Sequence, residues 1–284
     1  MRELIVNKKY DGKKLNTFLL DSFDGLSMNS IYKALRQKDV RINDIKVKDN
    51  VVLNENDVVK VYIADEFLFK KVDFNIVFED DNILVVNKPE GIEVVTSDNS
   101  STLTSLLQET YSYIKPCHRI DRNTKGLVLF AKNEDSLNIL LEKFKNREID
   151  KFYKCTIYGV PKKNMDTLNA YLFKDNKKSL VYISDVPKKG YDKIITSYKI
   201  LKVNKENNTS ILEIKLHTGK THQIRAHLAH IGYPIIGDGK YGNNDINKKF
   251  KKKTQELCSY KLIFNFKTDS GMLNYLNGKE IYIK

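Results

Sequence analysis

The chain has 284 residues and a hydrophobic content of 41%, enough to bury a core in one large domain or in one large and one small domain. Its formal net charge of +13 and pI near 9.3 favour a polyanionic partner. No apolar run reaches the length of a membrane span, and the first residues, MRELIVNKKYDG, lack the apolar region and cleavage site of a signal peptide. We therefore expect a cytoplasmic protein that binds nucleic acid and no membrane.

The cysteine and histidine pattern does not predict a metal site. Cys117, Cys155 and Cys258 are odd in number and far apart, and none belongs to a CxxC pair, which is typical of reduced thiols. His222 and His227 are five residues apart, a spacing that does not stack both rings on one face of a helix. We therefore expect no bound metal.

A nucleotide cofactor is not expected either. The tripeptide Gly219-Lys220-Thr221 resembles the end of a phosphate-binding P-loop, but Ile214 stands where that motif needs a glycine. The sequence offers no other cofactor motif. We therefore expect chemistry by protein side chains alone.

Residues 1–63 are predicted to form a small α+β domain. Leu15, Phe18 and Leu19 follow helical spacing, and Ser27 is a good N-cap for a second helix. The following residues alternate with a period of two and contain turn residues, which predicts small strands. Basic residues on the second helix favour an RNA-binding module, although a helix–hairpin cap without a ligand has the same pattern.

A second domain is predicted over residues 74–284, after a linker at residues 64–73 that shows no regular period. Its patterns predict paired strands on either side of a turn at residues 79–82, and further strands and helices: strands at 152–158, 194–201 and 211–216, helices at 102–110, 134–147 and 221–231. This mixture predicts an α+β fold with a mixed, largely antiparallel sheet flanked by helices.

Two segments late in the chain allow predictions of local structure. Thr221 is predicted to cap the last helix, and Gly232 to end it. The basic run NNDINKKFKKK at residues 243–253 predicts a loop that contacts phosphates. A solvated charge run has the same composition.

The stretch CHRIDRNTKGLVLFAK, residues 117–132, combines a charged turn with an apolar run. Asp121 is its one carboxylate, among His118, Arg119 and Arg122. Residues 123–126 are typical of a turn, and residues 127–131 predict a buried strand. A carboxylate held beside a core strand is well placed for chemistry, whereas a surface turn with a solvated salt bridge is the alternative.

This stretch closely resembles the His-Arg-Leu-Asp-x-x-Thr-x-Gly-Leu motif of the RluA-type pseudouridine synthases, which isomerise uridine to pseudouridine in ribosomal or transfer RNA. Three more segments resemble motifs of that family in the same order: VNKPEGIEV at 86–94, KFYKCTIYG at 151–159 and LHTGKTHQIRAHLAHIGYPIIGDGKYG at 216–242. Residues 1–63 resemble the S4-like domain found ahead of many such catalytic domains. The resemblance implies this two-domain architecture and an enzyme that needs no cofactor.

The resemblance also implies roles for individual residues. Asp121 matches the catalytic aspartate, Arg225 the cation that holds it ionised, and Tyr153 the ring that lies against the target base. Arg119 matches the arginine that fills the space left by a flipped nucleotide. Further RNA contacts are expected from His118, Arg122, Lys220, His222, Gln223, Lys33 and Arg36.

Two functions follow from these patterns. The first is an RNA pseudouridine synthase, expected to be monomeric, with large-subunit ribosomal RNA favoured over transfer RNA. The alternative is a non-catalytic RNA-binding protein on the same scaffold. The intact set of Asp121, Tyr153 and Arg225 favours the enzyme, while the choice of sugar or base as the target of Asp121 stays open.

Overall fold

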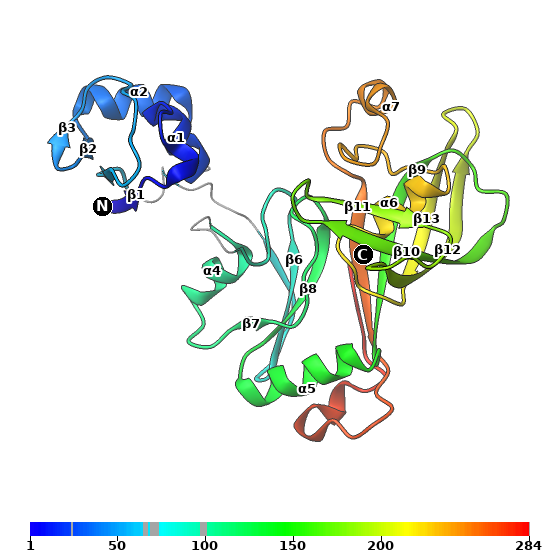
Figure 1. Ribbon diagram of the computed structural model, residues 1–284. Helices are drawn as coiled ribbons and strands as arrows, with labels where there is room; N and C mark the ends of the chain where they lie inside the picture. The colour runs from blue at the N-terminus through cyan, green and yellow to red at the C-terminus, as the bar shows by residue number, and fades with distance from the viewer. Residues whose placement is uncertain (24, 65–67, 69–73, 97–100, 284) are drawn as a thin grey trace. The chain divides into compact units, whose positions relative to one another are not determined.

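The computed structural model describes residues 1–23, 25–64, 68, 74–96 and 101–283 (Figure 1). It divides into two compact units, Met1–Asp73 with Thr96–Ser101, and Phe74–Val95 with Thr102–Lys284. Most of the predicted linker at residues 64–73 lies outside the described residues, but Leu68 is described and is buried in the core of the N-terminal unit. None of the described helices is both long and apolar enough to cross a membrane.

The N-terminal unit joins two helices to a small sheet whose strand order is β1-β4-β2-β3. Its elements are β1 (Arg2–Ile5), η1 (Lys8–Tyr10), α1 (Leu15–Ser22), α2 (Met28–Gln37), β2 (Val40–Ile42), β3 (Ile45–Lys46) and β4 (Val58–Val61). The predicted cap is confirmed: the Ser27 hydroxyl accepts a hydrogen bond from the Ser30 amide at 3.2 Å, within a capping box. Ile31 and Leu35 bury the inner face of α2, which leaves Lys33 and Arg36 exposed on its outer face.

The second unit is built on one large sheet, which has eleven strands within the described residues. Its main path runs β11-β10-β12-β13-β9-β14-β8-β6-β5, with β15 paired to β14 and β7 to β8. The strands are β5 (Asn75–Glu79), β6 (Ile83–Lys88), β7 (Lys115–Pro116), β8 (Lys125–Ala131), β9 (Ile149–Tyr158), β10 (Met165–Asp175), β11 (Leu180–Ser184), β12 (Asp192–Asn204), β13 (Thr209–Leu216), β14 (Leu257–Phe264) and β15 (Glu280–Tyr282). Among these described pairs, β8 with β14 is parallel and the others are antiparallel, so the predicted fold class is confirmed.

Helices flank this sheet. They are α4 (Leu103–Gln108), α5 (Glu134–Lys145), α6 (Gln223–His230), α7 (Asn244–Lys249) and the 3₁₀ turn η2 (Gly271–Leu276). The helix α5 packs against β8, and α6 packs against β11 and β12 (Figure 1). Asn133 caps α5 as predicted, through a hydrogen bond from the Ser136 amide at 2.8 Å.

Gly126 differs from its predicted role, because it lies inside β8 and not in the preceding turn. Its φ is +116°, and a Cβ built on it would lie 2.1 Å from the carbonyl oxygen of Ser259 on β14. Only glycine therefore allows β8 and β14 to approach in parallel at this point. This close approach sets the start of β8, three residues after the turn that carries Arg122.

Two further local predictions were wrong, and one hairpin was missed. Thr221 does not cap α6, because the helix begins at Gln223 and its N-cap is His222, which has a left-handed φ of 53°. The run at 243–253 is not wholly a loop, since Asn243 caps the short helix α7. The hairpin of β10 and β11 was not predicted, because few of its side chains are buried and the alternation of hydrophobicity is weak.

Candidate active site

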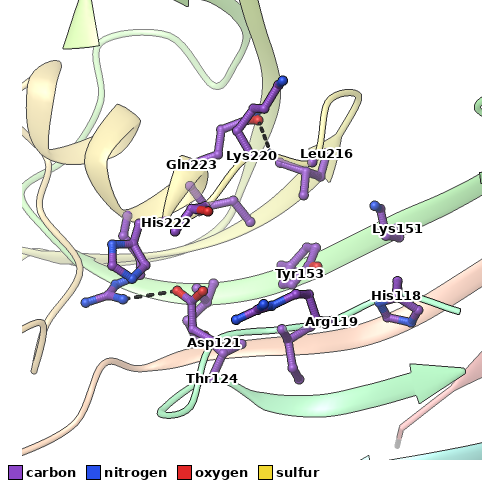
Figure 2. Close-up of a pocket in the computed structure, with 16 residues that line it drawn as sticks. His118, Arg119, Asp121, Thr124, Lys151, Tyr153, Leu216, Lys220, His222 and Gln223 are labelled. Carbon is purple, nitrogen blue, oxygen red and sulfur yellow. Dashed lines mark hydrogen bonds and ion pairs between the residues drawn. The ribbon is translucent and has the colours of Figure 1, made fainter. Parts of the chain in front are cut away.

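A cavity of about 280 Å³ opens where the turn before β8, the strand β9 and the start of α6 meet (Figure 2). Asp121, Tyr153 and Arg225 all line it. Asp121 and Arg225 are 104 residues apart in the sequence, so the fold of the sheet brings them together.

Asp121 is held at the wall of the cavity by one charged hydrogen bond. Its Oδ2 accepts from Nη1 of Arg225 at 3.0 Å, and the pair is partly buried. Its other oxygen, Oδ1, has no hydrogen bond to any described residue. The carboxylate is therefore fixed through one oxygen and open to a substrate through the other.

Arg225 makes its bidentate contact with a different carboxylate, Asp238. Nε and Nη2 donate to the two oxygens of Asp238 at 2.7 and 2.9 Å. Burial raises the pKa of Asp238, but the hydrogen bonds and charge of Arg225 outweigh it and hold that pKa below its ordinary value. Arg225 thus gives two of its donors to the almost fully buried Asp238 and one to the less buried Asp121.

Asp238 was not recognised from the sequence as a site residue. Its backbone surroundings explain its position: its Oδ1 also accepts from the amides of Lys240 and Tyr241, at 2.9 and 3.0 Å. The segment GDGKYG supplies this tight loop, and its glycines were a signal of it. The carboxylate is thus fixed by backbone and orients Arg225 toward Asp121.

Lys88 fastens the other side of the Asp121 turn. This side chain is fully buried, and its ammonium donates to the carbonyl oxygens of Pro89, Ile92 and Arg122 at 2.7, 2.8 and 2.9 Å. Burial lowers the pKa of Lys88 to about 8, an effect that the negative charge of Asp121 opposes. Lys88 therefore holds two loops together directly behind the turn that carries Asp121.

Tyr153 comes from β9, and its side chain is 5% exposed against the cavity. Burial raises the pKa of its phenol above the ordinary range, so the ring is neutral. No group of three or more histidine, cysteine or carboxylate side chains within the described ranges is arranged to hold a metal ion. Asp121 is the carboxylate that lines the cavity, beside the guanidinium groups of Arg119 and Arg225, two lysines and the ring of Tyr153.

Comparison with known proteins agrees with this geometry. The family model for RNA pseudouridylate synthase matches residues 82–230, which include Asp121, Tyr153 and Arg225. The chain belongs to that family. An uncharacterized RNA pseudouridine synthase of Mycoplasma capricolum is 34% identical over 303 residues, which cover 99% of this chain and 97% of that protein. A protein of Rickettsia felis, named ribosomal large subunit pseudouridine synthase C, is 32% identical and covers 88% of this chain.

Solved structures share the fold of this pseudouridine synthase. Human RNA pseudouridylate synthase domain containing 1 aligns with a TM-score of 0.59 and 22% identity, covering 69% of this chain and 80% of that one. Human RNA pseudouridylate synthase domain containing 4 aligns with a TM-score of 0.58, covering 74% of this chain and 88% of that one. The mixed, largely antiparallel sheet is thus a shared scaffold.

The residues predicted to contact RNA have different surroundings in the synthase. Arg119 is exposed and lines the cavity, whereas the exposed Arg122 donates from Nε to the carbonyl of Gly91 at 3.0 Å. Lys220 lines the cavity and pairs with Asp192 at 2.7 Å.

His118 and His222 are both neutral at the cavity wall. His118 accepts a hydrogen bond from the Leu129 amide at 3.1 Å, and burial lowers its pKa to about 3. Burial also lowers the pKa of His222, whose Nδ1 lies 2.8 Å from the hydroxyl of Tyr241. The Tyr241 ring in turn lies 5.3 Å from the Arg225 guanidinium, a contact not predicted from the sequence.

Gln223, which was also predicted to contact RNA, lines the cavity but makes its hydrogen bonds inside the protein. Its side chain is 2% exposed, and its amide is fully used inside the protein. The oxygen accepts from the Thr218 hydroxyl and the Lys220 amide, and the nitrogen donates to Ile195 and Thr196. Gln223 therefore shapes the loop that covers the cavity.

Proposed function

We propose that this protein isomerises specific uridines of large-subunit ribosomal RNA to pseudouridine, with Asp121 as the essential catalytic group. The observation that carries the proposal is the Asp121 carboxylate, which lies 3.0 Å from Arg225 at the wall of an open cavity and has one oxygen free. Several relatives carry the name ribosomal large subunit pseudouridine synthase C, which favours that RNA as substrate. Transfer RNA is the alternative substrate.

The reaction breaks a carbon–nitrogen bond between ribose and uracil and forms a carbon–carbon bond between the same partners. It needs no net redox change, so side chains suffice. Asp121 acts on the sugar or the base as nucleophile or proton acceptor, and Arg225 pairs with it and orients it. Because Asp238 occupies two donors of Arg225, the free oxygen of Asp121 remains available to the substrate.

A base stacked in RNA does not reach Asp121, so the target nucleotide must leave the stack. We assign to Arg119 the stacking on the bases that remain, which offsets part of the cost of flipping. Tyr153 offers its ring to the flipped uracil. Neutral His118 and His222, together with Lys220, complete the contacts around the nucleotide.

We assign RNA binding without chemistry to an S4-like domain at residues 1–63, followed by a linker at 64–73 and a catalytic domain at 74–284. Exposed Lys33 and Arg36 on α2 supply its phosphate contacts. We further propose that the enzyme acts as a monomer without metal or cofactor. Both domains then contribute to RNA affinity, whereas only the catalytic domain carries out the reaction.

Mapping pseudouridines in RNA from cells with and without the gene tests the proposal. We expect one or more large-subunit positions to lose pseudouridine without the gene and to regain it with the parent gene but not with the Asp121→Asn gene. If the pseudouridine that depends on the gene lies in transfer RNA, the proposed activity stands and only the substrate changes. Identical maps would favour the non-catalytic RNA-binding alternative.

A further inference from the structure

Lys151 lies between two hollows of the catalytic unit. It precedes Tyr153 by two residues on β9, so it faces the same side of the strand, and both residues line the cavity (Figure 2). It lines the catalytic cavity and also a neighbouring groove of about 810 Å³. The two hollows share four lining residues, Lys151, Leu216, Gly219 and Lys220, so they adjoin one another.

The ammonium of Lys151 has no hydrogen bond or ion pair with any described residue. The Nζ atom lies 5.3 Å from the centre of the Phe144 ring. It also lies close to Gly219, where an added Cβ would be 3.3 Å from Nζ. Burial lowers its pKa. A desolvated cation without a counter-ion is costly, and an anion from outside the protein would offset that cost.

The two buried lysines among the described residues of this unit, Lys88 and Lys143, are different from the half-buried Lys151. Lys88 donates to three carbonyl oxygens, and Lys143 lies 3.0 Å from the carboxylate of Glu148. Both of these lysines stabilise loops inside the protein. Lys151 has no such internal partner, which points to a role outside folding.

The groove beside Lys151 has an excess of positive charge. Exposed Lys145, Arg147 and Lys267 line it. Its one lining carboxylate, Asp150, is already bound by Lys215 at 2.9 Å and by the Asn265 amide at 2.7 Å. The groove therefore suits a chain of phosphates better than a neutral or cationic ligand.

We propose that Lys151 binds a backbone phosphate next to the target uridine, and that the groove of Lys145, Arg147 and Lys267 holds the adjoining RNA strand. This inference rests on the proposed function and adds to it the path of the substrate. A compact ammonium suits a single phosphate as a point charge. Because Lys151 shares its strand face with Tyr153, the bound phosphate fixes the nucleotide whose base lies on that ring.

Salt-dependent binding tests the phosphate contact without needing the natural target. The probe is an oligouridylate of about twelve nucleotides, and the slope of log affinity against log salt falls by about 0.7 for each lost phosphate contact on a single strand. We expect this loss for Lys151→Met, with affinity about tenfold weaker at low salt, and recovery for Lys151→Arg. Lys199→Met, an exposed position on β12, is the matched control and keeps the parental slope. A parental slope for Lys151→Met overturns the proposal.

Neutral methylphosphonate linkages locate the contact. In a short substrate with a mapped uridine, one neutral linkage near that uridine should slow the parent enzyme and have no added effect in Lys151→Met. Equal slowing of both proteins by every linkage would overturn the assignment. Lys151→Met should also unfold at or above the parental midpoint, since it removes an uncompensated buried charge, whereas a lower midpoint would indicate a structural role. If the parent forms no pseudouridine, the proposed function fails but the binding slopes still decide the phosphate contact.

Discussion

Charged side chains in the catalytic cavity and on α2 of the N-terminal unit are held in opposite ways. Asp121 contacts Arg225, which is fixed by the buried Asp238. Lys33 and Arg36 are exposed and have no hydrogen bond or ion pair within the described part of the chain. The difference teaches that an exposed basic face can be predicted from local sequence alone, whereas the position of a partly buried carboxylate depends on partners from distant segments.

The largest effect that would break this contrast is expected at Asp238. Asp238→Asn removes a buried charge beside Arg225, so the guanidinium is drawn fully to Asp121. We expect a loss of about 3–5 kcal/mol in unfolding free energy, because one partner of a buried pair is removed. Turnover should fall by about a hundredfold, because the shifted guanidinium would also occupy the oxygen of Asp121 that is now free for the substrate.

Urea unfolding and tritium release from labelled uridine measure both effects. The control is Asp245→Asn, an exposed carboxylate on α7 whose one ion pair with a described residue spans 3.9 Å. It should change stability by less than about 0.5 kcal/mol. Equal effects at the two positions would contradict the role given to Asp238.

Asp238 also shows where sequence reasoning ends. The buried strand β8, the caps of α2 and α5 and the antiparallel sheet were predictable because they depend on local patterns. Asp121 and Arg225 were identified by resemblance, but the arrangement of Arg225 between two carboxylates depends on contacts 13 and 104 residues apart. The burial of Gln223 was not predictable for the same reason, since burial of a polar side chain depends on segments distant in the sequence.

The buried Lys88 sharpens the contrast with the exposed charges of α2, because it should make the unfolding free energy depend on pH. Its folded pKa of about 8 lies below the ordinary value of 10.5, so between these values the unfolded chain binds a proton that the folded protein has released. Unfolding free energy should therefore rise with pH in that window, by up to about 3 kcal/mol, and not change below it. The measurement is the difference in unfolding free energy between the parent and Lys88→Met across this range, which cancels other titrations. A difference that stays flat with pH would show that Lys88 is not desolvated.

Arg119 should show a smaller effect that depends on the form of the substrate. Arg119→Ala removes a stacking cation at the cavity, so modification of a stem-loop should slow by about tenfold. A flexible strand needs less unstacking and should slow by less than about threefold. The ratio of the two rates is the readout, and an unchanged ratio relative to the parent would count against flipping by Arg119.

The smallest effect is expected on α2. Replacing Lys33 and Arg36 together by glutamine should weaken binding to long RNA by only a few fold, because each charge is exposed. Turnover at saturating enzyme should stay at the parental value. Filter binding at matched salt and single-turnover rates separate the two quantities, and a large fall in turnover would contradict the division of labour.

The central claim is tested most directly by tritium release from carbon five of uridine, because that carbon loses its hydrogen when the new bond to ribose forms. The Asp121→Asn variant keeps the size of the side chain and removes its charge. The account predicts no release above background at saturating enzyme, with RNA affinity within about twofold of the parent and an unchanged unfolding midpoint. Release at the parental rate would show that Asp121 is not the catalytic group.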